Sequence, residues 1–243
     1  MWAHLNRQGV TVARCTVERL MRRHGWQGVT RTRRVRTTIA DPTASRAPDL
    51  VDRHFKVTAP NRLLVADFTY VPVGGRFVYT AFVIDAYAGT IVGWQVGARH
   101  TADFVKAALV DALETRRRQG HPITGGVHHS DAGSEYTSLS LTERLTDAGL
   151  APSIGTVADA YDNALAETTI GLYKTECIGT HQLPTPFHQG LTSVVEVELA
   201  TANWVHWFNT SRLMHRLNRR PPLEAETEYY DQHHAQQGVT PTR

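Results

Sequence analysis

The chain has 243 residues, 41% hydrophobic and 20% charged, which is an ordinary composition for a globular protein. No apolar run is long enough to span a membrane, and the N-terminus is too polar for a signal peptide, so we expect a cytoplasmic protein. Residues 1–60 carry 12 Lys and Arg against 4 Asp and Glu, whereas residues 61–243 carry 14 against 19. A basic head on an acidic body indicates a polyanion-binding arm beside a separate domain, and a merely solvated basic surface is the alternative.

The basic head reads as two helices. Residues 1–9 have the pattern of a helix that ends at Gly9, and residues 10–25 form a second helix with Ala13, Val17, Leu20 and Met21 on one face. Two helices joined by a glycine turn resemble a helix-turn-helix, whose second helix enters a DNA groove. The predicted DNA contacts of this segment are Arg14, Arg19, Arg22, Arg23, Arg33 and Arg34.

Three strands open the main domain. Residues 63–71 are apolar on both faces, as in a central strand, except for Asp67. Residues 77–84 and 90–96 follow across short glycine-bearing turns, which predicts two antiparallel hairpins.

Helices and short strands alternate after these hairpins. We expect an amphipathic helix over residues 101–118 with Thr101 as its N-cap, a strand at 127–129, and a helix through Leu141 and Leu145. Residues 151–154 are a short connection or strand. The succession predicts an α/β fold with a mixed sheet flanked by helices.

A further helix carries an acid and a lysine. Ala166, Ile170, Tyr173 and Cys177 form its apolar stripe, while Glu167 and Lys174, seven residues apart, point the same way about 10 Å from each other. Such a pair is also common on solvated helices.

The C-terminal region is predicted to contain a long helix over residues 191–213, a basic turn at 216–222 and a polar tail. We expect Trp204, Trp207 and Phe208 to belong to the core of the protein, with base stacking as the alternative.

Three acids stand out. A buried carboxylate at Asp67 is costly, and either a divalent cation or an ion pair would compensate it, unless the side chain faces solvent. Asp131 follows the strand at 127–129, where chain turns commonly present functional groups. Glu167 comes next, with 35 residues between it and Asp131.

Five short sequence segments accompany this spacing: Ala66-Asp-Phe-Thr-Tyr-Val71, Phe82-Val-Ile-Asp-Ala-Tyr87, Ile91-Val-Gly-Trp94, His128-His-Ser-Asp-Ala-Gly-Ser134 and Tyr161-Asp-Asn-Ala-Leu-Ala-Glu167. Together the spacing and the segments resemble the DDE catalytic core of retroviral integrases and, over nearly the whole chain, the OrfB transposase of the IS-three family.

The resemblance implies an RNase H-like core that catalyses DNA cleavage and strand transfer at insertion-sequence ends. Asp67, Asp131 and Glu167 would be the catalytic residues and would hold two Mg²⁺ ions, with Mn²⁺ as an alternative. Lys174 would contact phosphate near the transposon terminus. Asn163 would contact the substrate or orient the backbone, or would cap its helix.

The resemblance also implies a domain organisation and partners. We expect a helix-turn-helix-like segment at residues 1–40, a linker at 41–60, the catalytic core at 61–180 and a helical extension at 181–243. The implied partners are the terminal inverted repeats, target DNA, further copies of the chain in a homo-oligomer and an upstream OrfA-type protein, in a nucleoid-associated location.

Several polar residues are expected to be structural. Asp85 is interpreted as a hairpin residue or a rival metal ligand, and residues 116–118, all arginine, as a solvated helix end. His128 and His129 are assigned structural or DNA-facing roles because Mg²⁺ prefers oxygen ligands. Cys15 and Cys177 are predicted to be reduced packing residues within helices.

Leu64, Ala132 and Glu135 depart from the commonest family pattern, in which a tryptophan, a larger and often basic residue, and a glutamine are usual. Glu135 adds negative charge near Asp131, which would weaken DNA binding. Two alternatives therefore stay open: an inactive DNA-binding remnant of a decayed transposase, and a stand-alone RNase H-like nuclease.

Overall fold

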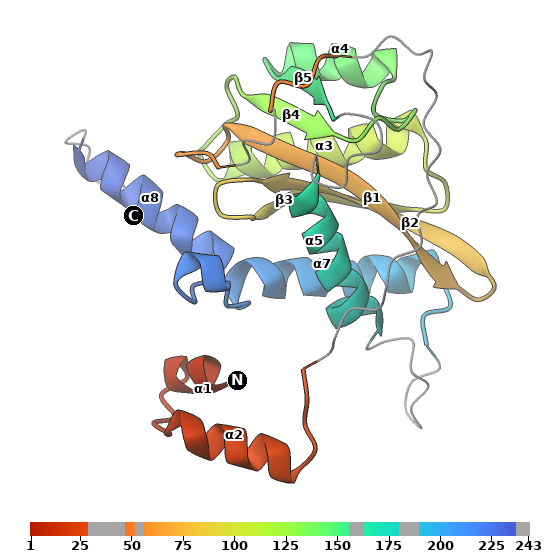
Figure 1. Cartoon of the computed structure of the whole chain (residues 1–243). Coiled ribbons are helices and arrows are strands. Elements are labelled where there is room, and N and C mark those ends of the chain that lie inside the picture. Colours follow the sequence, from red (N-terminus) through yellow and green to blue (C-terminus); the bar gives the residue numbers. More distant parts are fainter. Residues whose placement is uncertain (29–46, 52–55, 156–162, 180–189, 237–243) are drawn as a thin grey trace.

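The computed structural model describes residues 1–28, 47–51, 56–155, 163–179 and 190–236 (Figure 1). The predicted contacts Arg33 and Arg34 lie outside these ranges. The elements, in chain order, are α1 (Trp2–Arg7), α2 (Arg14–Arg23), β1 (Leu63–Val73), β2 (Arg76–Asp85), β3 (Ile91–Gly97), α3 (Ala102–Arg118), β4 (Val127–Ser130), α4 (Leu139–Asp147), β5 (Ala151–Ile154), α5 (Ala164–Leu172), η1 (Tyr173–Ile178), α7 (Val194–Thr210), η2 (His215–Leu217) and α8 (Pro222–Gln236).

Five strands form one mixed sheet in the order β3-β2-β1-β4-β5. The pairs β1–β2 and β2–β3 are antiparallel, as the two glycine-bearing turns predicted, and β1–β4 and β4–β5 are parallel. The ambiguous residues 151–154 are therefore a strand. β1 lies at the centre of the sheet, which explains why its sequence is apolar on both faces.

Helices cover both faces of the sheet, so the sheet has a core on each side. Leu64 and Ala66 pack with the buried residues of α3 and α4, whereas Val65 and Val71 pack with those of α5, η1 and α7. Figure 1 shows α5 crossing in front of the sheet and α3 behind it. Since side chains alternate along a strand, Asp67 points to the same face as Val65, which is the face that α5 covers.

The helix that follows residues 156–162 is not a single regular α-helix as predicted. It runs as α5 to Leu172 and then widens into the π-helix η1. The predicted apolar stripe is nevertheless buried, since Ala166, Ile170, Tyr173 and Cys177 all join the core. Tyr173 also exchanges buried hydrogen bonds with Thr80 and Thr201 through its hydroxyl group.

The C-terminal region differs from its prediction in two ways. Trp204 and Phe208 are buried as expected, but the Trp207 side chain is 41% exposed because it lies on the outer side of α7. The predicted polar tail contains a 15-residue helix, α8, that begins at Pro222. Proline at the first helical position, followed by Glu224 in the first turn, is a start signal that would have revealed it.

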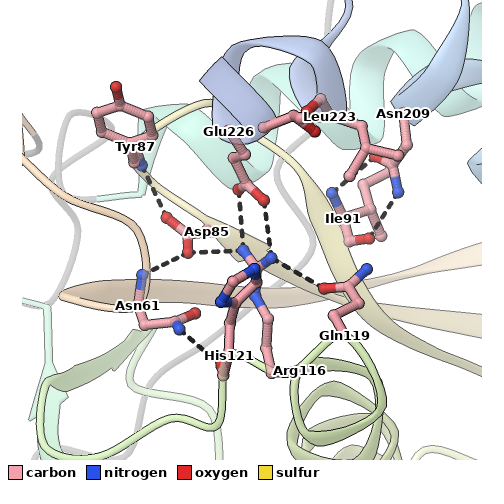
Figure 2. Close-up of polar contacts among 11 residues, drawn as sticks. Asn61, Asp85, Tyr87, Ile91, Arg116, Gln119, His121, Asn209, Leu223 and Glu226 are labelled. Atoms are coloured by element: carbon pink, nitrogen blue, oxygen red, sulfur yellow. Dashed lines mark hydrogen bonds and ion pairs between the residues drawn. The ribbon is translucent and has the colours of Figure 1, made fainter. Parts of the chain in front are cut away.

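A buried ion cluster attaches α8 to the sheet (Figure 2). Arg116, at the end of α3, is 1% exposed and donates hydrogen bonds to Glu226 of α8 at 2.7 and 2.9 Å and to Asp85 at 2.9 Å. The expectation that Arg116 is solvated was therefore wrong. Asp85 is fully buried and accepts from the backbone amides of Asn61 and Tyr87, so its partners are protein groups and it is not a rival metal ligand.

The N-terminal helices bury few of their side chains. α2 buries Val17 but leaves Leu20 42% exposed, and Cys15, predicted to be a packing residue, is exposed, whereas Cys177 is buried as predicted. Among the described residues, an ion pair between Arg7 and Glu224 of α8 joins the N-terminal helices to the C-terminal region, and Arg219 lies over the ring of Trp2. None of the described helices is both long and apolar enough to cross a membrane.

Candidate functional site

The parallel pairing of β1 with β4 brings two of the predicted acids together. Ala66 of β1 pairs with Ser130, the last residue of β4. Asp67 and Asp131 therefore occupy the next position along each of these two neighbouring strands. In parallel strands, residues in register point to the same face of the sheet. Asp67 is 8% exposed and Asp131 is half-buried, which makes this pair of carboxylates partly shielded from water.

Backbone amides hold each aspartate locally. The Phe68 amide donates to Oδ1 of Asp67 at 2.8 Å, and the Gly133 amide donates to Oδ1 of Asp131 at 3.2 Å. A Cβ atom on Gly133 would lie 3.1 Å from Oδ1 of Asp131 and 3.3 Å from Oε2 of Glu135. Glycine therefore lets the turn after β4 fold closely around its carboxylates.

Asn163 anchors the start of α5 to β1. It occupies the N-cap position as predicted, but its side chain makes no capping hydrogen bond; its amide group donates instead to the carbonyl oxygen of Ala66 at 3.1 Å. Asn163 is buried, and this hydrogen bond joins the start of α5 to β1. Glu167 lies one turn further along α5, on the same side of the helix as Asn163, and is half-buried.

Sequence reasoning missed Tyr136, which lies beneath the acids. Its ring packs 6.1 Å from that of Phe68, and its hydroxyl group is buried with no hydrogen-bond partner among the described residues. Burial first, and then the charges of Asp67, Asp131 and Glu135, raise the pKa of Tyr136 well above its usual value. The available sequence signal was that Tyr136 comes five residues after Asp131.

Glu135 and His100 form the next contact outward. Nδ1 of His100 lies 2.6 Å from Oε1 of Glu135, and the His100 ring stacks on Phe68 at 5.6 Å. The carboxylate of Glu135 is therefore paired with a histidine rather than directed only at DNA. His100 too was missed, because it lies 35 positions from Glu135 in the chain.

A structural or DNA-facing role was expected for the two neighbouring histidines, and their burial favours the structural one. His128 and His129 are both buried, and Nδ1 of His129 lies 2.9 Å from the Ser153 hydroxyl group. Burial, with a smaller contribution from His129, lowers the pKa of His128 to about 4. Neither side chain can therefore reach a DNA backbone from this position.

Lys174 follows Glu167 by seven residues. It is exposed on η1, and its Nζ atom lies 4.4 Å from the centre of the Tyr70 ring, close to the β1–β2 hairpin. Leu64 and Ala132, which depart from the commonest pattern, pack into the core on the α3 face.

The donor chemistry of the three acids suits Mg²⁺, because all three supply carboxylate oxygens. However, no group of three or more His, Cys, Asp or Glu side chains in the described residues is arranged so that it could hold a metal ion. The structure thus brings Asp67 and Asp131 together and places Glu167 on the adjacent helix, without a closed three-acid cluster.

Family models match most of the chain. Residues 57–160 and 148–222 match models described as integrase core domain, and residues 1–34 match an HTH-like domain.

Curated relatives cover the same span. The chain is 50% identical to a putative transposase for insertion sequence element IS986/IS6110 from Mycobacterium tuberculosis, over 96% of this chain and 81% of the relative. It is 48% identical to the transposase for insertion sequence element IS629 from Shigella sonnei, over 95% of this chain and 73% of that one.

Solved structures share the fold. The integrase catalytic core domain of HTLV-2, solved in complex with magnesium, matches 70% of this chain and 98% of its own with a TM-score of 0.52 and 15% identity. A chain of the simian T-cell lymphotropic virus intasome, solved with PP2A regulatory subunit B56 gamma, matches 77% of this chain and 60% of its own with a TM-score of 0.57 and 14% identity. The core is therefore the RNase H-like fold that was predicted.

Proposed function

The chain belongs to the family of insertion-sequence transposases that carry an integrase core domain, and we propose that Asp67, Asp131 and Glu167 are its catalytic residues for DNA cleavage and strand transfer. The observation that carries this proposal is the register of β1 and β4, which puts Asp67 beside Asp131. The hydrogen bond from Asn163 to Ala66, which holds α5 and hence Glu167 at the same strand, supports the third assignment.

The same three carboxylates are proposed to hold two Mg²⁺ ions, with Mn²⁺ as a substitute. Two bound divalent ions activate the attacking oxygen and stabilise the leaving oxygen of an in-line displacement at phosphorus. Asp67 is held within a central strand, and Asp131 in a tight turn, so these two ligands are preorganised, whereas Glu167 completes the set from α5.

The proposed reaction also needs nucleophiles and residues that contact the DNA. Water would be the nucleophile for cutting the transposon end, and the freed 3′-hydroxyl would attack target DNA. Lys174, exposed on η1, is proposed to contact phosphate near the transposon terminus. Arg14, Arg19, Arg22 and Arg23 of α2 are exposed and are proposed to contact the terminal repeats. In place of the predicted DNA contact, we assign Asn163 the role of a positioning residue.

A strand-transfer assay tests the catalytic assignment. The substrate is duplex DNA that carries the element's own terminal repeats, with Mg²⁺ present. Asp67→Asn, Asp131→Asn and Glu167→Gln should each lower the rate by at least about 10²–10³-fold, because each removes a carboxylate that is proposed to hold the metal ions that stabilise the transition state. The control Glu143→Gln, which changes an exposed glutamate on α4, should keep full activity.

The outcomes separate the alternatives. Wild-type activity in Glu167→Gln would remove that residue from the catalytic set. DNA binding without chemistry in the wild type would identify an inactive remnant, and hydrolysis of RNA:DNA hybrids without strand transfer would identify a nuclease.

The assembly is also a proposal. We propose that the chain acts on DNA as a homo-oligomer, and the division at residues 1–40, 41–60, 61–180 and 181–243 and the OrfA-type partner stay predictions. Sedimentation of the chain with and without terminal-repeat DNA measures the oligomer.

A further inference from the structure

We propose that the β1–β2 hairpin beside Asp67 carries a stacking surface for the unpaired bases of a DNA end. This inference rests on the proposed function, since it names the form of DNA that the site holds. The surface, here called the aromatic row, consists of Phe68, Tyr70, Phe77, Tyr79 and His100.

The aromatic row is continuous along one face of the hairpin. Phe68 and Tyr70 alternate with Asp67 along β1, and Tyr79 of β2 pairs directly with Tyr70. His100, which follows β3, stacks on Phe68 at 5.6 Å and lies 4.5 Å from the Tyr79 ring. Tyr70 and Phe77 meet edge to face at 5.2 Å. The five rings thus lead from the residue next to Asp67 towards the tip of the hairpin.

One end of the aromatic row is fixed and the other is open to water. Phe68 is half-buried and packs 6.2 Å from Phe104 of α3, whereas Tyr70 is 39% and Phe77 56% exposed. β1 and β2 are 11 and 10 residues long against 7 for β3 and 4 for β4, so the hairpin extends beyond the rest of the sheet (Figure 1). Its outer rings are therefore accessible to a ligand.

Positively charged residues lie next to these exposed rings, one in space and two in the chain. The Lys174 ammonium group lies 4.4 Å from the centre of the Tyr70 ring, in the geometry of a cation–π contact. Arg76 precedes Phe77 and Arg99 precedes His100 in the chain, and both arginines are exposed. The carboxylate of Glu135 is paired with His100.

Rings flanked by cations fit single-stranded DNA better than an apolar protein surface. Bases stack on aromatic side chains regardless of sequence, and Lys and Arg attract the phosphates between them. An apolar protein partner would instead leave Lys174 and the arginines poorly solvated. Phe68 follows Asp67 in β1 but points to the opposite face of the sheet, so the aromatic row would take the terminal nucleotides of an end whose strands have separated, with the reacting phosphate on the Asp67 face.

Binding of short oligonucleotides to the full chain tests this surface. The probes are a single strand of about 12 nucleotides that contains 2-aminopurine, and its blunt duplex, both in EDTA so that no chemistry occurs. Tyr70→Ala and Phe77→Ala should each weaken single-strand binding about 5- to 100-fold and reduce the quenching of 2-aminopurine by stacking. Duplex binding should change less than about 2-fold, since the exposed arginines of α2 remain.

Two controls keep the test independent of folding. Trp207→Ala removes an exposed aromatic ring from α7, away from the hairpin, and should leave both affinities unchanged. Phe77→Trp keeps an aromatic face and should retain single-strand binding. Equal melting temperatures of all variants would show that the differences arise at the surface.

The result is separable from the catalytic proposal. Asp67→Asn and Glu167→Gln should bind the single strand as the wild type does, so a wrong catalytic assignment would not affect this measurement. Unchanged affinity and quenching in the Tyr70→Ala, Phe77→Ala double variant would overturn the stacking surface. A changed oligomeric state of that variant, with unchanged single-strand affinity, would also overturn it and would identify the hairpin as a protein interface.

Discussion

Asn163 shows how one side chain can couple two elements of the site. Its amide nitrogen reaches the Ala66 carbonyl 97 positions away, next to Asp67, while its own backbone begins α5. The hydrogen bond is buried, so its loss leaves a carbonyl without that donor and releases the start of the helix that carries Glu167.

We therefore predict that Asn163→Ala lowers the strand-transfer rate about 10-fold or more, because a small displacement of a catalytic group has a large effect on rate. Single-turnover assays with Mg²⁺ measure the rate, and urea denaturation should show a loss of about 1–3 kcal/mol in the free energy of unfolding. The matched control Asn203→Ala, at an exposed position on α7, should change neither. Full activity in Asn163→Ala would remove the positioning role.

His128 predicts a pH dependence of stability. Burial lowers its pKa from 6.5 to about 4, so the folded chain favours neutral histidine more than the unfolded chain does. The resulting stabilisation is complete above pH 6.5 and is lost as the pH falls towards 4, with a maximum of about 3 kcal/mol.

His128→Leu should flatten the dependence of the unfolding free energy on pH between pH 4 and 6.5, as followed by urea denaturation at several pH values. His206→Leu, which changes an exposed histidine of α7, should leave the slope as in the wild type. A slope that is unchanged in His128→Leu would assign the acid sensitivity to other groups.

At the scale of elements, α3 packs unusually close to β3. A Cβ atom on Gly93 would lie 2.3 Å from the Ala108 carbonyl oxygen and 2.5 Å from the Ala112 backbone nitrogen. Both contacts are with backbone atoms, which cannot move aside as a flexible side chain can. Glycine at this position therefore sets the distance between the helix and the sheet.

Gly93→Ala should reduce the free energy of unfolding by about 1–3 kcal/mol or more, because overpacking forces α3 away from the strand. Thermal denaturation followed by circular dichroism measures the loss. Gly28→Ala, where the added methyl group meets nothing within 4 Å, should melt like the wild type. Equal melting temperatures for the two variants would mean that α3 can move without cost.

At the scale of the whole molecule, the Arg116 cluster joins the end of the chain to the catalytic core. Two carboxylates, from β2 and α8, share one guanidinium group (Figure 2). Burial first, and then the charge of Glu226, raise the pKa of Asp85 to about 6. The stabilisation that comes from this shift is therefore complete below pH 3.8, the pKa of Asp85 in the unfolded chain. It is lost as the pH rises through about 6.

Arg116→Met should cost about 3–5 kcal/mol in the free energy of unfolding at pH 8, because two buried carboxylates lose their cation. The loss should be smaller at pH 5, where protonation of Asp85 removes a charge. Arg117→Met is the control, because the neighbouring Arg117 is exposed and paired with Glu114 at the surface, and its loss should leave the free energy of unfolding nearly unchanged. A similar cost at both pH values would contradict the charge explanation.

The candidate site was only partly predictable from the sequence. Asp67, Asp131 and Glu167 could be named because their spacing and flanking segments resemble a known catalytic core. Tyr136 and His100 could not be assigned in this way, since their roles depend on rings and charges contributed by other segments. The same holds for the aromatic row, whose members come from three separate stretches of chain.

The sequence by itself determined the local elements: apolar periodicity predicted the strands and helix faces, and glycine turns predicted the two antiparallel hairpins. Tertiary structure alone decided which polar groups are buried and which residues they contact. Arg116 looks solvated within its own helix, but it is buried because Glu226, 110 positions later, returns to it on α8. The burial and charge of a side chain depend on contacts between distant segments, and only the folded chain brings those segments together.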